Sequence, residues 1–413
     1  MKIQDIDGDT FNAFASKHIL KNFFQTKEYG DVMSHSEFSV RYVGGFVNNE
    51  LVAAALVLYK SIAPSIKYGY VPRGYLINFY DIELVKEWTK KIKDFFFSKG
   101  YAFIKINPEV TFAKVDFDSK TKIINSKSEK LVNTLKELGY DKLKDNLYFE
   151  SLLPKYTPVI NLPTYNFEDL DPELIKQIKD YDDQGIYLLN GNENDIDTFY
   201  SFVENKNNKT ITYYKTLYNT FKKSDKSDLL LANLDYSDYV KYLQRKYIEE
   251  QSNNEKINEE FKSNPNDEEL FKKKMESDKL LNDIQADIAL GNQKMQESVL
   301  QEIYGAALII RHEGRVSIII SGQKKDFRLL DTKTFIYYKI IEEYKKKGYL
   351  FVDLYGITGD FTDNNPYKDL NDFKLKFKPT IYEYIGEFDL IVNKPIHQIL
   401  WSTNKIQKEF FYK

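Results

Sequence analysis

The segment KIIEEYKKKGYLFVDLYG, residues 339–356, has a near match earlier in the chain, KIKDFFFSKGYAFIKINP, residues 91–108. Each segment joins a helical pattern ending in Lys-Gly-Tyr to a short apolar run. A glycine at this position favours the end of a helix, and the tyrosine opens the predicted strand. The chain therefore repeats a helix followed by a strand in its two halves.

A pair of apolar runs precedes each of these segments. In residues 44–60 the runs meet at Asn48-Asn49, and in residues 304–322 they meet at His312-Glu313-Gly314, which are hairpin signals. The order strand, strand, helix, strand thus occurs twice. Chance reuse of a common unit would explain it, but the shared order favours duplication. We predict an α/β fold with two acetyltransferase-like subdomains in tandem.

A different pattern lies between the halves. From residue 236 to residue 261, steps of four and three residues form a heptad seam with polar positions at Glu250 and Asn254. Residues 263–269 break this helix, and Asp267 is a predicted N-cap of a second one. Two antiparallel helices of this length form a coiled-coil arm about 40 Å long. A purely structural hairpin is favoured over a tRNA clamp.

These patterns give the predicted domain organisation. Residues 1–153 form the first subdomain, with 394–413 packing on it. Residues 154–235 and 302–393 form the second subdomain, and 236–301 form the arm. Prolines at 154, 158 and 163 mark the crossing between the subdomains.

The composition narrows the class of protein. The 413 residues carry 59 basic and 62 acidic side chains, a net charge of −3. Contact with nucleic acid or anionic lipid therefore requires a local basic patch. The absence of cysteine excludes disulfides and a thiolate nucleophile. The N-terminus lacks a signal-peptide pattern, and no apolar run is long enough to span a membrane, so we expect a cytoplasmic protein.

The common catalytic and cofactor motifs are missing. The four histidines are scattered without metal-ligand spacing, so no metal is expected. After the strand-like RVSIIISG, residues 322–335 read GQKKDFRLLDTKTF and lack the glycines of a coenzyme A pyrophosphate loop. An acyl-CoA N-acyltransferase is consequently the least favoured of the functions considered.

The segment quoted first, residues 339–356, continues into a glycine turn. In FVDLYGITGDF, residues 351–361, Gly356 and Gly359 bracket Ile-Thr. Glycines placed in this way allow positive φ or a close backbone approach that a Cβ would block. A turn fitting the core and a turn admitting a substrate are both consistent with the pattern.

This turn also belongs to a set of motifs that resembles the Fem-type aminoacyltransferases, the FemABX family, which builds peptidoglycan interpeptide bridges. The most specific motifs lie near the C-terminus and weaker ones near the N-terminus. They are YGITGDF (355–361), FKLKF (373–377), EYIGEFDLIVNKPIHQIL (383–400), FFQTKEY (23–29), YVPRGYLINF (70–79) and AFIKINPEV (102–110).

The resemblance implies an aminoacyl-tRNA co-substrate and no cofactor. The implied acceptor is a stem-peptide or bridge amine of a peptidoglycan precursor, lipid II or its nucleotide-linked form. Glycine, serine and alanine are all candidate donors. Contact with the membrane would be peripheral, through the lipid-linked substrate. Association with itself or with other Fem-type proteins is left open.

The resemblance also implies candidate residues in the second half. Lys374, in the Phe-Lys-x-x-Phe motif, and Asp360 are the catalytic candidates. Without the resemblance, Lys374 would be interpreted as a solvated lysine on a strand edge. The implied substrate-binding residues are Tyr355, Gly356, Thr358, Gly359 and Phe373.

In the first half, Arg73, Gln25 and Lys27 are candidates for holding acceptor phosphate or peptide. A buried structural arginine is an equal interpretation of Arg73.

The sequence departs from the family in three places. Lys376 stands next to the final Phe of the Phe-Lys-x-x-Phe motif, where the family has glycine. Asn107 replaces an aspartate at a strand end, and acidic residues replace basic ones at positions 180, 182 and 183. Three explanations remain open: a changed substrate, a relative that binds precursor or a Fem-type partner without catalysis, or basic contacts supplied elsewhere. The candidates for such contacts are Lys206, Lys209, Lys215, Lys222 and Lys223.

Overall fold

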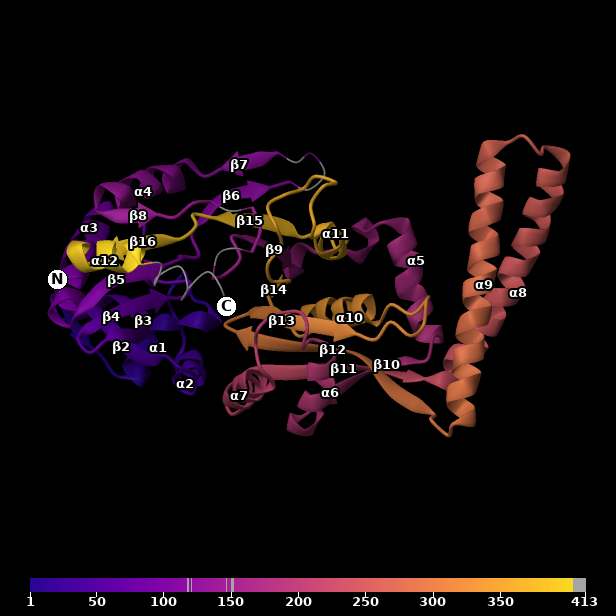
Figure 1. Cartoon of the computed structure of the whole chain (residues 1–413), viewed down its shortest axis with the longest axis horizontal. Helices are drawn as coiled ribbons and strands as arrows, with labels where there is room; N and C mark the ends of the chain where they lie inside the picture. Colours follow the sequence, from indigo (N-terminus) through magenta and orange to yellow (C-terminus); the bar gives the residue numbers. More distant parts are fainter. Residues whose placement is uncertain (117–118, 120, 146, 150–151, 404–413) are drawn as a thin grey trace.

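The chain forms two β-sheets that lie side by side, with a helical arm projecting at one end (Figure 1). The computed structural model describes residues 1–116, 119, 121–145, 147–149 and 152–403. No helix in these described ranges is long and apolar enough to cross a membrane. The predicted mixed α/β fold with two acetyltransferase-like units and an inserted arm is confirmed.

The first sheet has seven strands in the order β1-β2-β3-β4-β5-β16-β8. Its strands are β1 (Lys2–Asp5), β2 (Ser39–Val47), β3 (Glu50–Ala63), β4 (Ile66–Val71), β5 (Tyr101–Ile106), β8 (Tyr140–Lys142) and β16 (Phe388–Ile391).

The second sheet has nine strands in the order β10-β11-β12-β13-β14-β9-β15-β6-β7. Its strands are β6 (Thr111–Val115), β7 (Lys122–Ile124), β9 (Tyr156–Asn161), β10 (Ile186–Gly191), β11 (Ser227–Asp235), β12 (Gln301–His312), β13 (Arg315–Gln323), β14 (Phe351–Asp353) and β15 (Thr380–Tyr384).

Helices cover both sheets and form the arm. The α-helices are α1 (Gly8–Ala15), α2 (Lys27–Ser34), α3 (Ile82–Ser98), α4 (Ser126–Glu137), α5 (Pro172–Asp180), α6 (Ile196–Ser201), α7 (Ile211–Lys222), α8 (Tyr236–Ser263), α9 (Glu268–Gln296), α10 (Thr332–Lys346), α11 (Lys368–Leu375) and α12 (Lys394–Ser402). The short 3-10 helices are η1 (Phe23–Gln25), η2 (Leu162–Thr164), η3 (Phe167–Asp169), η4 (Tyr181–Asp183) and η5 (Glu193–Asp195).

The repeated unit is present in both sheets. Helices α3 and α10 end just before Gly100 and Gly348, whose φ angles of 78° and 76° allow the chain to reverse into β5 and β14. Strand β5 pairs parallel with β4, and β14 pairs parallel with β13. The hairpin that corresponds to β12–β13 is therefore β3–β4. The predicted match with the hairpin at Asn48-Asn49, which is β2–β3, is wrong by one strand.

The two sheets exchange strands. β16, from near the C-terminus, lies between β5 and β8 in the first sheet, and β6 and β7 lie beside β15 in the second. A buried ion pair between Lys105 Nζ and Asp389 Oδ1, 2.8 Å long, joins β5 to β16. The domain division at residues 153 and 393 stays a prediction, and sheet membership crosses it at 111–124 and 388–391.

The last described helix packs on the first subdomain. α12 contacts β5, and the His397 ring lies against Phe103. Leu400 is buried in a core that also holds residues of both sheets. The part of the predicted C-terminal segment beyond residue 403 lies outside the described residues.

The arm consists of α8 packed on α9 (Figure 1). Its predicted polar position is observed, because Asn254 is buried and donates to Ser277 Oγ at 3.0 Å. Asp267 caps α9 as predicted, accepting from Leu270 N. At the base of the arm, the buried Asp287 carboxylate accepts the backbone N–H groups of Arg328 and Leu329, 2.9 and 3.0 Å away. The arm is thereby fixed to the loop before α10.

Candidate active site

The candidate site lies where β4 and β5 of the first sheet end against β9, β14 and β15 of the second. Three neighbouring cavities of about 140, 20 and 170 Å³ occur there, and Tyr384 lines all of them. Arg73 lines the first two, whereas Glu109 and Arg315 line the last two. Together they form a cleft between the sheets, which we call the inter-sheet cleft.

Arg73 lies at the centre of this cleft. Its guanidinium donates to Pro154 O at 2.7 Å and lies 4.6 Å from the centroid of the Tyr384 ring. The side chain is 6% exposed. The interpretation of Arg73 as a buried structural residue is therefore confirmed. It also lines two of the cavities, and its contact with acceptor phosphate or peptide stays a prediction.

A set of charged side chains lies beside Arg73. Arg315, at the start of β13, pairs with Glu109, and its Nη1 lies 3.8 Å from Asp353 Oδ2. Burial raises the pKa of the Asp353 carboxyl above its ordinary value. The cleft thus combines two arginines with two carboxylates, a mixture suited to a zwitterionic peptide.

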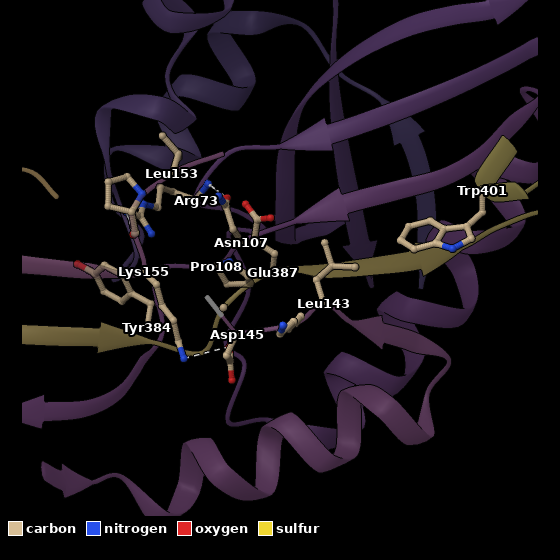
Figure 2. A pocket seen from close by; sticks show the side chains of 13 residues that line it. Arg73, Asn107, Pro108, Leu143, Asp145, Leu153, Lys155, Tyr384, Glu387 and Trp401 are labelled. Atoms are coloured by element: carbon tan, nitrogen blue, oxygen red, sulfur yellow. Dashed lines mark hydrogen bonds and ion pairs between the residues drawn. The ribbon is translucent and has the colours of Figure 1, made fainter. Parts of the chain in front are cut away.

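The cavity in Figure 2 adds two further carboxylates, those of Asp145 and Glu387. Asn107 accepts a hydrogen bond from the Arg73 backbone N at 2.8 Å, and Glu387 lies next to it (Figure 2). Glu387 Oε1 accepts from Leu152 N, and burial raises the pKa of its carboxyl. At the far end of the same cavity Trp401 of α12 is 43% exposed, which leaves a ring available for contact.

Lys374 lies one layer behind the cleft. It belongs to α11 and is 6% exposed, so the alternative of a solvated lysine on a strand edge is wrong. Its Nζ donates to Gly356 O at 2.7 Å, and Gly356 lines the cleft. Burial, together with the charge of Lys333, lowers the pKa of Lys374 to about 7. An amine with this pKa exchanges its proton near neutral pH.

The remaining candidates near Lys374 have different surroundings. Tyr355 lines the cleft, with φ of 64°, and burial raises its pKa to about 12. Thr358 is fully buried and bonded to Asn365 and Asn371. Asp360 accepts from Tyr148 at 2.8 Å and from Thr362. Asp360 and Thr358 are not among the residues that line the three cavities, and their roles toward substrate stay predictions.

Known proteins match this chain over nearly its full length. Residues 6–405 match the model of the FemAB family. The chain belongs to the FemAB family. The resemblance to Fem-type aminoacyltransferases is confirmed, and with it the expectation of an enzyme of that family.

Relatives of this FemAB protein cover its full length at low identity. It is 21% identical over 422 residues to aminoacyltransferase FemA of Staphylococcus epidermidis, covering 99% of this chain and 100% of the relative. It is 22% identical over 431 residues to aminoacyltransferase FemA of Staphylococcus aureus strain N315, covering 100% of both. The crystal structure of FemX aligns with a TM-score of 0.72 at 17% identity, covering 97% of this chain and all of FemX.

The glycine turn of this FemAB protein has an internal explanation. A Cβ on Gly356 would overlap the Pro154 ring, and a Cβ on Gly359 would overlap the Tyr156 ring. The groups brought close to the end of β14 are therefore side chains around β9. The interpretation of a turn that fits core geometry is confirmed, and substrate passage is not needed to explain these glycines.

Two candidates in the first half have structural partners. The Gln25 amide is fully buried, accepts from Leu56 N at 2.9 Å and donates to Pro72 O at 2.8 Å. This amide holds β3 against the turn that carries Arg73. Lys27 forms an ion pair with Asp9 at 2.7 Å. Neither side chain lines the three cavities, so contact with substrate stays a prediction for both.

Phe373, the last candidate, packs edge-on against Tyr337 with ring centroids 4.8 Å apart. The Lys333 ammonium lies 3.6 Å from the centroid of its ring. Phe373 therefore lies beside cations and is not among the residues that line the three cavities, so its contact with substrate stays a prediction.

Sequence reasoning missed Glu109, Arg315, His312, Tyr384 and Glu387. His312 lines the cleft with neither ring nitrogen bonded, and burial, with the charge of Lys226, lowers its pKa to about 4. The residues of the Arg315–Glu109 pair are 206 positions apart in sequence. The only local signal was a charged Asp353 within an apolar strand.

The start of α10 differs from a pyrophosphate site. Gln323 Oε1 accepts from Lys333 N, and Asp331 Oδ1 accepts from Thr334 N, at 2.6 and 3.1 Å. The helix N–H groups that could hold a pyrophosphate are thus occupied by the chain's own side chains. This arrangement disfavours a coenzyme A donor, as the missing glycines predicted. In the described ranges, no group of three His, Asp or Glu residues could hold a metal ion.

Proposed function

We propose that this protein transfers an amino acid, glycine, serine or alanine, from aminoacyl-tRNA to the stem-peptide or bridge amine of a peptidoglycan precursor such as lipid II. The single observation that carries the proposal is the family match over residues 6–405, together with a cleft at the matching motifs. The reaction needs the tRNA as co-substrate and no cofactor.

The chemistry requires orientation more than acid–base groups. The uncharged acceptor amine attacks the ester carbonyl carbon. The new N–C bond forms as the C–O bond to the terminal ribose breaks, and the amine proton ends on the ribose oxygen. Because the ester is already activated, the protein has only to align the two substrates and to stabilise the oxyanion. The paired arginines and carboxylates of the cleft suit the alignment of a peptide.

Lys374 is the proposed catalytic residue. As an ammonium it would stabilise the developing oxyanion, and as an amine it would accept the proton released by the nucleophile; a pKa of about 7 permits either form at neutral pH. Both roles require the ligand to reach past Gly356 O, to which Nζ is now bonded.

A second candidate is a relative that binds cell-wall precursor, or a partner Fem-type enzyme, without catalysis. The sequence feature that favours this candidate is the set of acidic residues at positions 180, 182 and 183. Asp180 pairs with Lys246 of the arm at 2.9 Å, and Asp182 lies 3.9 Å from Lys339. These two carboxylates pair with lysines of other helices and do not line the three cavities, so they give no support to lost activity in the cleft.

The test is a transfer assay with purified protein, lipid II and total tRNA charged with radiolabelled amino acids. Lys374→Ala is run beside wild type, with Lys368→Ala as a matched control on the same helix. Label should enter lipid II with wild type and the control, and fall by at least about a hundredfold with Lys374→Ala. Folded wild-type protein that binds lipid II but transfers nothing from any charged tRNA would favour the binding-only relative.

A further inference from the structure

His312 lies at the end of β12, and the register of the second sheet directs it into the inter-sheet cleft. It pairs across the β12–β13 hairpin with Arg315, so both side chains lie on the same face of the sheet. Ser317, two positions further along β13, belongs to that face as well. All three residues line the smallest of the three cavities.

The His312 side chain is buried without a hydrogen-bond partner. It is 6% exposed, and within the described residues neither of its ring nitrogens is bonded. A neutral imidazole has one nitrogen that donates and one that accepts. Native proteins rarely leave such buried groups unpaired, because their loss of contact with water is then not compensated. The ring therefore points to a ligand group that completes its hydrogen bonds.

The charges around His312 keep its ring neutral. The nearby cations are Arg315 of β13, Lys21 before η1 and Lys226 before β11. The nearby carboxylate is that of Glu28 on α2, which is already paired with Lys226 at 2.6 Å. Burial, together with these cations, lowers the pKa of the His312 ring to about 4. The ring is consequently uncharged at neutral pH, and one of its nitrogens keeps a lone pair.

The other side-chain nitrogens that line this cavity only donate, because they belong to two arginines, a lysine and an asparagine amide. The two carboxylates of the cavity, those of Glu109 and Asp353, flank Arg315. Among the described lining residues, His312 therefore offers the nitrogen lone pair that an N–H group of a ligand can use.

The cavity at His312 has the size of one terminal group. Its volume of about 20 Å³ accommodates a group as large as one water molecule, such as an amine nitrogen, but not a whole amino acid. The neighbouring cavities, of about 140 and 170 Å³, are wider and share Tyr384 with it. A side chain that enters through one of them can therefore place its last atom next to His312.

We propose that His312 binds the acceptor amine by accepting a hydrogen bond from one of its N–H groups. This inference rests on the proposed function and adds the residue that orients the nucleophile. With one N–H group held by His312, the lone pair of the uncharged amine has a fixed direction, which attack on the ester carbonyl requires. The ring does not take up the amine proton, which ends on the ribose oxygen.

The placement also agrees with the role proposed for Lys374. Gly356 lines the cavity at His312, and its carbonyl oxygen accepts from Lys374 Nζ at 2.7 Å. The bound amine and the proposed catalytic lysine would thus both be next to Gly356.

The test measures the affinity for an acceptor with and without its amine, by isothermal titration calorimetry. The two probes are nucleotide-linked precursors, one with a free side-chain amine and one with a single glycine already attached to that amine. Each probe is compared with an analogue in which a methyl group replaces the terminal amine. We expect wild type to bind the amine form of at least one probe at least about tenfold more tightly than the methyl form.

The variants change the acceptor nitrogen. His312→Leu should reduce the preference for the amine to less than about twofold, because leucine cannot accept a hydrogen bond. His312→Phe, which keeps a ring without nitrogen, should do the same. His312→Gln should keep part of the preference, since its amide oxygen can accept. Leucine and phenylalanine remove two unpaired buried nitrogens, so the melting temperature of these variants should not fall.

The control His35→Leu makes the same change at an exposed histidine that is not among the residues lining the three cavities, and it should keep the wild-type preference. An equal preference in wild type and His312→Leu would overturn the proposal, and a water molecule would then be the partner of the ring. Wild type that does not distinguish the amine form from the methyl form of either probe would overturn it too.

The outcome is separable from that of the proposed function. An amine preference that depends on His312, without transfer from any charged tRNA, would uphold the amine site and reject the reaction. Transfer by wild type with an unchanged kcat/KM for the acceptor in His312→Leu would uphold the reaction and reject the amine site.

Discussion

At the scale of single residues, the distinguishing feature is a cation held where cations are costly. Lys374 is buried, and among the described residues its hydrogen-bond acceptor is one backbone carbonyl, although an ammonium has three donors. A lysine in this setting reduces stability when it is charged. Its position behind the cleft wall agrees with the catalytic role that we propose for it.

The first prediction concerns Lys374→Met and pH. The folded pKa, about 7, lies below the ordinary value of 10.5, so between these values the unfolded chain binds more protons than the folded one. Wild-type stability should therefore rise relative to the variant as pH increases from about 7 to about 10.5. Guanidinium denaturation of both proteins at several pH values measures this difference. Parallel curves would mean that Lys374 is not desolvated.

At the scale of elements, the local signals were sufficient for most of the fold. Gly100 and Gly348 end their helices, Asp267 caps α9, and Asn254 is the polar layer of the arm, because each depends on neighbours within a few positions. The strand exchange could not be predicted. The choice of β16 as partner of β5 depends on packing between segments far apart in sequence.

The predicted site residues also fall into two groups, those that the structure places at the cleft and those that it does not. The motif residues Lys374, Tyr355 and Arg73 lie at or directly behind the cleft, whereas Gln25 and Lys27 have structural partners. The Arg315–Glu109 pair was invisible in the sequence, because neither residue has a local pattern that marks it as buried and paired.

The second prediction tests the glycine turn. Gly359→Ala should reduce the free energy of unfolding by about 1–3 kcal/mol, because the new methyl group meets the rigid Tyr156 ring. Gly191→Ala is the control, since its Cβ would meet only leucine side chains, which can rotate away. Chemical denaturation compares the two. Equal stability of both variants would show that the turn has room for a ligand after all.

The third prediction concerns the base of the arm. In Asp287→Asn one oxygen is replaced by an NH₂ group that cannot accept, so the Arg328 or Leu329 N–H loses its partner at a cost of about 1–3 kcal/mol. Hydrogen exchange of residues 326–330 should accelerate. Asp283→Asn, which removes only an ion pair with the largely exposed Arg328, should change stability by less than about 1 kcal/mol. Equal protection in both variants would contradict the anchoring role.

At the scale of the whole molecule, the exchanged strands join the two walls of the cleft. The first sheet needs β16 from the end of the chain, and the second needs β6 and β7 from the first third. A core of buried residues also extends across both, including Phe23 and Phe221, whose rings lie 6.2 Å apart. The relative position of the walls is consequently fixed by covalent connections as well as by packing.

The fourth prediction follows from these connections. The two sheets should unfold in one calorimetric transition, because neither is complete without strands from the other half. A fragment of residues 1–153 should lack cooperative unfolding, whereas the full chain retains it. Two separate transitions for the sheets, or a fragment that folds alone, would contradict the prediction.

The late arrival of β16 also constrains how the protein is made. Asp389 must pair with Lys105, 284 residues earlier, before the first sheet is closed. At about 5–20 residues per second, the ribosome needs roughly 15–60 s to cover that distance. Throughout this interval the nascent N-terminal half carries an open strand edge at β5, so its synthesis falls in the class that depends on chaperones to prevent premature association.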